Sequence, residues 1–239
     1  ELIASVRAWD RLRNRVVWLA LGELGLAYRD SRLKQSLTDT EVGGGRLRGP
    51  TGRWVVLDAT FAVRQGSLSS RIAYSQLAGA LGVELGERVP ERELREAVLE
   101  LRRSKGMVLD GTDHDTWSAG SFFTNPILTT EQAEQLPEDA PRFPVTDHSQ
   151  VVLGTKAAPV IEGLVKTSAA WLIDHAGFSK GFAVEAGAPA GLSTKHVLAL
   201  TNRGGATGAD LARLRDAVVS GVRERYGVTL VPEPVQVGF

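Results

Sequence analysis

Residues 207–237, TGADLARLRDAVVSGVRERYGVTLVPEPVQV, decide the fold class because a helical pattern passes directly into an extended one. Thr207 with Asp210 forms a capping pattern, and Gly227 is typical of a helix end. The apolar positions between them recur at helical spacing: Leu211, Leu214, Val218 and Val222. VTLVPEPVQV then predicts a final strand, which two prolines interrupt. A long helix followed by a strand indicates an α+β protein.

The upstream chain contains the same mixture of elements. Residues 2–9 and 15–19 are short apolar runs around a charged turn, which predicts a strand pair. RWVVLDATFAVR, residues 53–64, alternates between apolar and polar positions. One predicted face carries Val55, Leu57, Ala59, Phe61 and Val63, and the other carries Asp58, Thr60 and Arg64. This alternation is typical of a half-buried strand.

Further helices are predicted near residues 73–81, in 90–106 and in 166–177. The second has a proline in its first turn and an apolar stripe of Leu94, Ala97, Val98 and Leu101. The third turns Ala169, Leu172, Ile173 and Ala176 inward and ends at Gly177. KHVLALTN, residues 195–202, predicts a strand. The proline-rich residues 129–160 predict a connection with a brief helix near Thr130.

The composition narrows the classes of partner. The chain has 239 residues, 43% hydrophobic and 23% charged, with a formal net charge of zero. The missing basic excess argues against a nucleic-acid partner. No apolar run approaches the roughly 20 residues of a membrane span. The absence of cysteine excludes disulfides, thiolate metal sites and a cysteine nucleophile. Glu1 replaces an initiator methionine and an apolar segment follows at once, so we expect an upstream portion.

Three charged side chains at predicted element ends are candidate site residues. Arg29 in YRDS either holds a phosphate or carboxylate or lies in an Arg29–Asp30 surface turn. Lys105 in RRSK follows a helix, where it either complements the helix dipole or faces an anionic ligand. Glu233 lies between two prolines, either as a rigidly held carboxylate or as a charge on an edge strand.

LDGTDHDTWSAGSFFTNP, residues 109–126, contains two more candidates. Asp110, Asp113, His114 and Asp115 could suggest a metal site, but their spacing matches no metal loop. A solvated Asp-Gly turn is the favoured interpretation, and no metal is expected. Ser121 lacks the G-x-S-x-G frame of a hydrolase nucleophile. Its hydroxyl could still act as a positioned proton donor. Gly120-Ser121 before two phenylalanines indicates either a strand end or a backbone brought close to a ligand.

Six motifs follow one another in a familiar order: YRDSRLK, RRSKGMVLD, GSFFTNP, KTSAAWLIDHAG, KHVLALTNRGGAT and RYGVTLVPEPV. Together they resemble the UDP-N-acetylenolpyruvoylglucosamine reductase family, in its longer-chain form, along almost the whole chain. GSFFTNP with the spaced YRDS is the specific part. The resemblance implies a cytoplasmic flavoprotein that uses NADPH and FAD to reduce UDP-N-acetylglucosamine enolpyruvate to UDP-N-acetylmuramate. Such an enzyme serves peptidoglycan synthesis and therefore cell shape and division.

The resemblance also implies roles for individual residues. The serine of GSFF, Ser121, donates the proton that follows hydride transfer. Arg29 and Glu233 stabilise the enolate-like intermediate, where fixed charges and donors have most effect. Four residues match substrate-binding positions of the family: Tyr74, Lys105, Asn125 and His196. The chain departs from the family pattern at Thr124, where a lysine is common, and in PEPVQ, where many relatives have EPEVR.

The implied architecture is the C-terminal part of a two-lobed FAD-binding reductase of the vanillyl-alcohol-oxidase type, with a mixed α+β substrate domain. Residues 1–103 would be the remainder of the FAD-binding domain, 104–228 the substrate domain, and 229–239 a strand returning to the first. The glycine-rich segment that holds FAD in the family is not in this chain, so its cofactor-binding residues are unknown. Two alternatives remain: a UDP-sugar-binding module without redox turnover, and a purely structural α+β domain.

Overall fold

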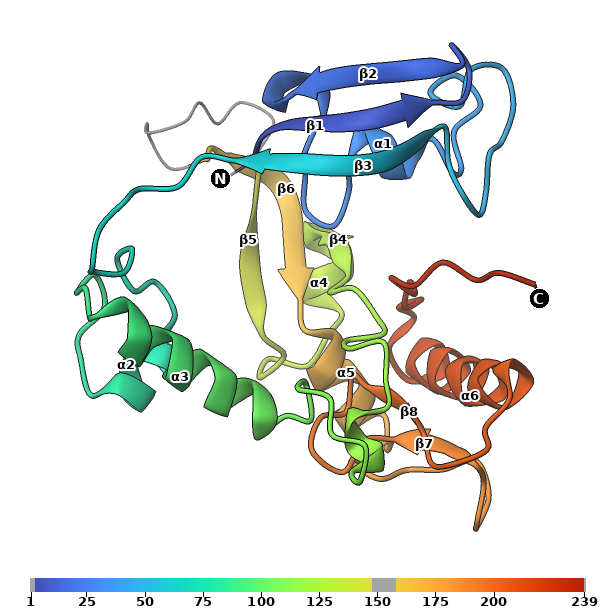
Figure 1. Cartoon of the computed structure of the whole chain (residues 1–239). Coiled ribbons are helices and arrows are strands. Elements are labelled where there is room, and N and C mark those ends of the chain that lie inside the picture. The colour runs from blue at the N-terminus through green and yellow to red at the C-terminus, as the bar shows by residue number, and fades with distance from the viewer. Residues whose placement is uncertain (1–2, 148–157, 239) are drawn as a thin grey trace.

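A computed structural model describes residues 3–147 and 158–238. Within these ranges, strands and helices are interspersed, which confirms the mixed α+β class. The strands form three small sheets in the described part, with the orders β2-β1-β3, β4-β6-β5 and β7-β8. The first sheet lies at the opposite end of the molecule from the third (Figure 1).

The first sheet is antiparallel and contains the predicted strand pair. It consists of β1 (Ile3–Asp10), β2 (Arg15–Ala20) and β3 (Trp54–Phe61). One face packs on the segment after β2, which holds the 3-10 turn η1 (Leu21–Glu23) and the short helix α1 (Arg32–Gln35). The cluster between them is buried: Val6, Ala8, Leu19, Leu24 and Trp54. This burial fixes α1 and the YRDS segment before it against the sheet.

Strand β3 differs from the prediction in both register and burial. The pairing with β1 shifts between Arg7 and Ala8, so a bulge breaks the strict alternation. Trp54 is the only residue of β3 that is buried. The face opposite the small core carries exposed apolar side chains, among them Trp18, which is 61% exposed, and Val55. Half-burial was therefore a wrong prediction, because no described element covers this face.

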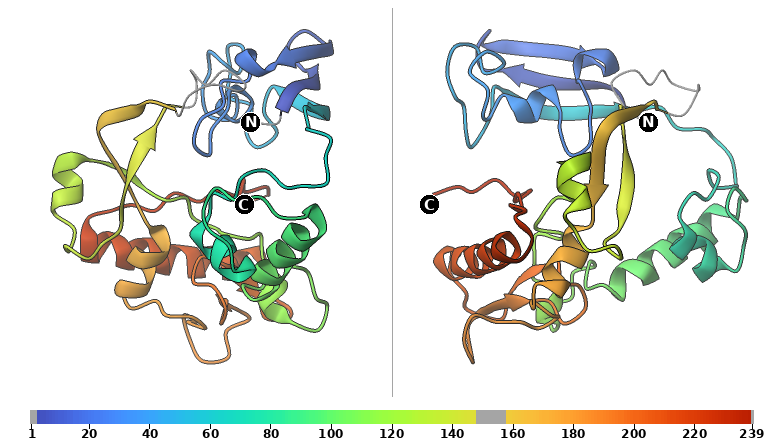
Figure 2. Two further views of the ribbon diagram at one scale, coloured as in Figure 1. Left: turned by 90° about the vertical axis from the view of Figure 1, so that its left-hand side faces the viewer. Right: turned by 180° about the vertical axis from the view of Figure 1, so that it is seen from behind.

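Helices α2 (Ser75–Leu81) and α3 (Glu91–Arg103) form a separate hairpin. They bury a small cluster of their own around Ile72, Ala78 and Val89. Gly82 ends α2 in the left-handed conformation, which is typical of glycine at a helix end. The hairpin extends on the side of the molecule opposite α6 (Figure 2).

The largest core lies in the C-terminal half. Its elements are β4 (Ile127–Thr129), α4 (Thr130–Glu134), β5 (Arg142–Thr146), β6 (Val160–Thr167), α5 (Ala169–His175), β7 (Ala190–Leu192), β8 (Leu200–Asn202) and α6 (Gly208–Tyr226). Phe123, at 2% exposed, and the inward faces of α5 and α6 meet in this core. The predicted inward residues Leu172, Ile173 and Leu214 are fully buried, which confirms both helix faces.

The prediction missed strands β4, β5, β6 and β7 and placed the start of β8 too early. The proline-rich connection holds the brief helix α4, as expected, but also the strand β5, and β6 begins at its last residue, Val160. KHVLALTN is a strand only from Leu200, because the Ser193 side chain accepts hydrogen bonds from the N–H groups of Lys195 and His196 and forms a turn. Residues 160–167 pair with β4 and β5 on either side.

The C-terminal segment after α6 is extended but is not a strand in the described structure. Its one β-bridge joins Pro232 to Phe123. Hydrogen bonds also run from Thr124 N to Val231 O (3.0 Å) and from Glu233 N to Phe122 O (2.8 Å). Because the two prolines have no N–H group, a regular ladder cannot continue. The segment nevertheless lies directly beside residues 122–124.

Candidate active site

Ser121 lies in a stretch that two other segments hold in place. Gly120 has φ of 78°, a left-handed conformation that favours glycine. Phe122 N donates to Leu198 O at 2.7 Å, and Phe123 packs edge-to-face on Phe122 while buried in the main core. Across the described residues, the Ser121 hydroxyl has no hydrogen-bond partner. The proton of this hydroxyl is therefore available to a ligand.

Arg29 and Glu233 form an ion pair next to this stretch. Arg29 has φ of 55°, unusual for a residue with a side chain, in a turn closed by the bridge between Ala27 and Asp30. Its guanidinium lies 2.8 Å from the Glu233 carboxylate. Arg29 thus lies in an exposed surface turn, as one alternative expected, but its partner is Glu233, since the Asp30 carboxylate accepts from Ser31 N and from Gln35. Glu233 does not lie on an edge strand in the structure, so that alternative is not supported.

Lys105 follows the C-terminal end of α3, and its ammonium donates to the side-chain oxygen of Gln76 at 2.8 Å. Gln76 belongs to α2, two residues after the N-cap residue Tyr74, which is 76% exposed. The α2–α3 hairpin therefore presents Tyr74, Gln76 and Lys105 together. Sequence reasoning missed Gln76, because no local pattern links it to a lysine 29 positions away.

His196 lies in the turn between β7 and β8. Burial lowers its pKa, and the charges of Lys105 and Lys180 lower the pKa further. The imidazole is therefore neutral at neutral pH and can accept or donate a hydrogen bond. Its main-chain N–H is bonded to the Ser193 hydroxyl oxygen at 3.3 Å, which fixes the backbone at this position.

These residues surround one cavity of about 690 Å³. Six of the seven residues selected from the sequence line it: Arg29, Tyr74, Lys105, Ser121, His196 and Glu233. They come from six separate segments of the chain. Among the described lining residues, Arg29, Arg102 and Lys105 are cationic and Glu233 is the one carboxylate. The excess of positive charge suits an anionic ligand.

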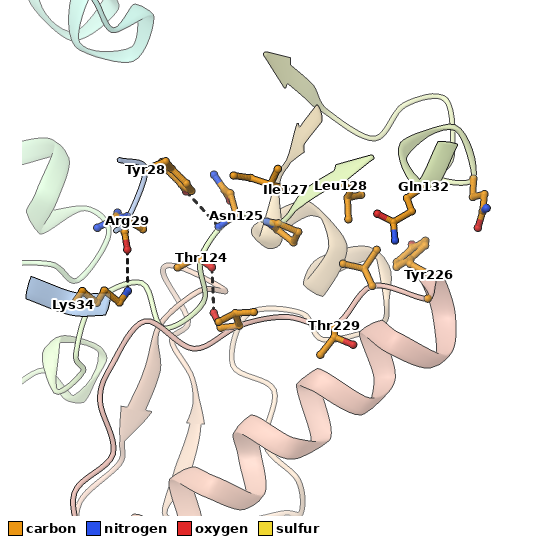
Figure 3. A pocket seen from close by; sticks show the side chains of 15 residues that line it. Tyr28, Arg29, Lys34, Thr124, Asn125, Ile127, Leu128, Gln132, Tyr226 and Thr229 are labelled. Atoms are coloured by element: carbon orange, nitrogen blue, oxygen red, sulfur yellow. Dashed lines mark hydrogen bonds between the residues drawn. The ribbon is translucent and has the colours of Figure 1, made fainter. Parts of the chain in front are cut away.

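Asn125, the seventh residue, is separate from this group. It lines a neighbouring cavity of about 550 Å³, which Arg29 also lines (Figure 3). Its side-chain oxygen accepts from Ala169 N at 3.0 Å, at the first turn of α5. Its backbone N–H points to the Tyr28 hydroxyl at 3.4 Å. The side-chain oxygen of Asn125 thus stabilises the start of a helix, and its side-chain nitrogen remains available to a ligand.

The acidic stretch 110–115 is not a solvated turn throughout. Asp110 is solvated and accepts from Thr112, but Asp115 is only 5% exposed. Asp113 pairs with Lys195 at 2.5 Å, and Asp115 pairs with Arg203 at 3.0 Å. No group of three metal-ligating side chains is found in the part of the chain that the structure describes. In the same part, no helix is long and apolar enough to cross a membrane.

The fold and the cavity define a class: an α+β protein with a cation-lined site built around a serine, an arginine and a glutamate. Comparison with known proteins makes this specific. Residues 112–237 match the family described as "UDP-N-acetylenolpyruvoylglucosamine reductase, C-terminal domain". The chain belongs to this family.

Several full-length proteins are similar to the chain. The UDP-N-acetylenolpyruvoylglucosamine reductase of Cutibacterium acnes is 48% identical over 238 residues, which is 100% of this chain and 55% of that protein. The protein of the same name from Thermobifida fusca is 46% identical and covered to 60%. The chain thus spans little more than half the length of these relatives. The match to a crystal structure of the Thermus caldophilus reductase includes 97% of this chain and 52% of that protein's chain, with 19% identity and a TM-score of 0.44.

Proposed function

We propose that this chain forms the substrate-binding part of a UDP-N-acetylenolpyruvoylglucosamine reductase, a cytoplasmic enzyme of peptidoglycan precursor synthesis. One observation carries the proposal: residues from six separate segments, which the family resemblance selects, line a single cation-rich cavity. Chance placement of solvated side chains would not bring them together. The proposed substrate is UDP-N-acetylglucosamine enolpyruvate, whose diphosphate and carboxylate match the positive charge.

The chain's own residues have distinct proposed tasks. Arg29 binds the enolpyruvyl carboxylate, and Glu233 keeps its guanidinium oriented across 2.8 Å. Ser121 donates its proton to the substrate carbon next to that carboxylate, as a general acid. Lys105 and Tyr74 hold the anionic and sugar portions, and His196 donates or accepts a hydrogen bond as a neutral imidazole. Asn125 contributes its amide from the adjoining cavity.

The family reaction also needs FAD and NADPH, and the described residues do not fit the FAD diphosphate. Gly43–Gly45 have their backbone N–H groups bonded to the carbonyls of residues 39–41. At the start of α6, the N–H groups of Gly204 and Ala206 are bonded to the Asn202 side chain. The N–H groups of Gly43–Gly45, Gly204 and Ala206 are therefore occupied and do not serve a diphosphate. The cofactor diphosphate is therefore assigned to no residue of this chain, although residues 1–103 are proposed as the remainder of the FAD-binding domain.

Calorimetric titration of the chain with UDP-N-acetylglucosamine enolpyruvate tests the proposal. We expect the chain to bind this compound, the Arg29→Ala variant to lose this binding, and the matched surface variant Arg95→Ala to retain it. Arg95 is exposed and lies on α3, away from the cavity. No binding, or equal binding in both variants, would remove the assignment.

A second candidate function is a UDP-sugar-binding module without turnover. The occupied N–H groups of Gly43–Gly45, Gly204 and Ala206 favour it for the chain by itself. The visible absorbance spectrum after mixing with FAD and gel filtration distinguishes the two. Retained flavin absorbance would favour the reductase, and its absence would favour the binding module.

A further inference from the structure

We propose that Asp115 is a positioning residue of the candidate active site, because its buried carboxylate holds the turn that carries His196 beside Ser121. The value of this placement for catalysis rests on the proposed function, whereas the placement itself is tested independently of it. Asp115 lies in the 3-10 turn η2 (His114–Thr116), within the acidic stretch that no proposed catalytic role uses.

The Asp115 carboxylate is fully engaged. Oδ1 accepts from Thr194 N at 2.9 Å, and Oδ2 accepts from the Thr194 hydroxyl. The guanidinium of Arg203, directly after β8, lies 3.0 Å from the carboxylate. Its second terminal nitrogen donates a hydrogen bond to Leu192 O at 2.7 Å. Burial alone would raise the pKa of Asp115, but the bonds from Thr194 and the charge of Arg203 outweigh burial and lower it. Asp115 is therefore a carboxylate at neutral pH, surrounded by donors.

A short path of bonds leads from this carboxylate to His196. Asp115 holds Thr194 on both carboxylate oxygens, and the neighbouring Ser193 is fully buried. The Ser193 hydroxyl oxygen accepts from Lys195 N at 3.0 Å and from His196 N at 3.3 Å. Two residues later, Leu198 O accepts from Phe122 N, the residue after Ser121. The turn that Asp115 organises thus determines how far His196 lies from Ser121.

Asp115 also touches the segment that presents Lys105. Gly106 has φ of 68°, and a Cβ atom at this position would lie 2.9 Å from Asp115 O. The main chain of Asp115 therefore packs directly on the glycine after Lys105. Asp115 is the point at which the α3 end and the β7–β8 turn meet, and both contribute a side chain to the same cavity.

The test is the pKa of His196, measured by NMR titration of the full chain, with His196→Gln to assign the signal. Burial keeps this pKa below the ordinary value in the unsubstituted protein, with Lys105 and Lys180 as the facing charges. In Asp115→Asn, the amide nitrogen would face the donors of Thr194 and Arg203 and release the turn. We expect the pKa of His196 to rise toward about 6.5 as the ring becomes solvated.

The sign separates positioning from a simple charge effect. Loss of a negative charge nearby would lower the pKa of His196, because it destabilises the imidazolium form. Asp113→Asn is the matched control: it removes a charge from the same stretch, and its partner Lys195 is part-exposed. We expect no rise in that variant. An unchanged or lowered His196 pKa in Asp115→Asn would overturn the proposal.

A second variant decides the question if Asp115→Asn does not fold. Thr194→Val keeps the carboxylate and its pair with Arg203 but removes the hydroxyl bond. A smaller rise in the His196 pKa is expected, and no rise would contradict the proposal. UDP titration of the same samples separates the two proposals: absence of UDP binding in all of them would count against the proposed function while leaving the NMR result decisive for Asp115.

Discussion

The Arg29 guanidinium lies 2.8 Å from the Glu233 carboxylate, although 204 positions separate the two residues. The pair joins the turn before α1 to the C-terminal segment across the mouth of the cavity. Both side chains are part-exposed, Arg29 to 51% and Glu233 to 32%. Water therefore screens their attraction, and orientation of Arg29 is a greater effect of the pair than stability.

Glu233→Gln should accordingly alter ligand binding more than folding. We expect a loss of less than about 1 kcal/mol in the free energy of unfolding, typical of an exposed ion pair. Affinity for UDP-N-acetylglucosamine enolpyruvate should fall clearly, because the guanidinium loses its fixed orientation. Urea denaturation and calorimetry check the two parts. Glu96→Gln, which removes an exposed pair on α3, serves as the control. A large folding loss with unchanged affinity would contradict the interpretation.

Ser121→Ala should separate binding from proton transfer. The chain should keep its affinity for the substrate, since the Ser121 hydroxyl supports no other contact in the described structure. The same substitution in a full-length reductase should leave flavin reduction by NADPH intact and slow the later proton transfer by roughly 10²- to 10⁴-fold. Stopped-flow absorbance resolves the two half-reactions. Unchanged turnover would remove Ser121 from the mechanism.

Lys105→Ala tests whether this cation faces a ligand or only complements the helix dipole. Loss of a charge-assisted hydrogen bond of about 1.5–3 kcal/mol should weaken UDP binding roughly 10- to 100-fold. Arg103→Ala, at the exposed end of the same helix, should cost similar helix stability without this loss of affinity. If both variants lose only stability, the helix-dipole interpretation is correct.

Asp10 should make the first sheet sensitive to acid. Burial alone would raise its pKa, but the Arg53 guanidinium and the backbone N–H groups of Leu12 and Arg13 outweigh burial and lower it to about 2. Because the folded-state pKa is below the ordinary 3.8, the stabilisation is complete above about pH 4 and is lost as the pH falls through 2. This amounts to about 2 kcal/mol.

Asp10→Asn checks this pH dependence. The variant should lose stability at neutral pH, because Arg53 is left nearly buried without its partner. Its unfolding free energy should also vary less between pH 4 and 2 than that of the unsubstituted chain. Asp216→Asn, at an exposed pair on α6, should leave the pH profile of the sheet unchanged. Guanidinium denaturation followed by circular dichroism measures both variants.

Local chemistry explains which elements the sequence could predict. Helix α6 begins and ends where expected, because Thr207 and Asp210 cap it reciprocally and Gly227 takes a left-handed conformation. Strand β5 was missed because Pro144 suggested a loop. Pro144 pairs with Val165 at the edge of its sheet, where a missing N–H group costs little. Propensity cannot reveal that a strand will be an edge strand.

The candidate site was predictable in its members but not in its contacts. Motif order selected Ser121, Arg29 and Glu233, and the structure brings them to one cavity. The bond between Lys105 and Gln76 depends on how two helices pack, which no local pattern encodes. Asp115 was placed in a solvated turn, because its burial arises only when residues 193–203 fold over it.

The uncovered face of the first sheet favours self-association of the chain in solution. Trp9, Val16 and Val55 form one cross-strand row there, and Trp18 follows in the next row. In the described structure, β2 and β3 also leave their outer edges unpaired. Surfaces of this kind promote adhesion between copies. At a net charge of zero, little repulsion opposes that adhesion. We expect the folded chain to aggregate during concentration and storage, under conditions in which it does not yet unfold.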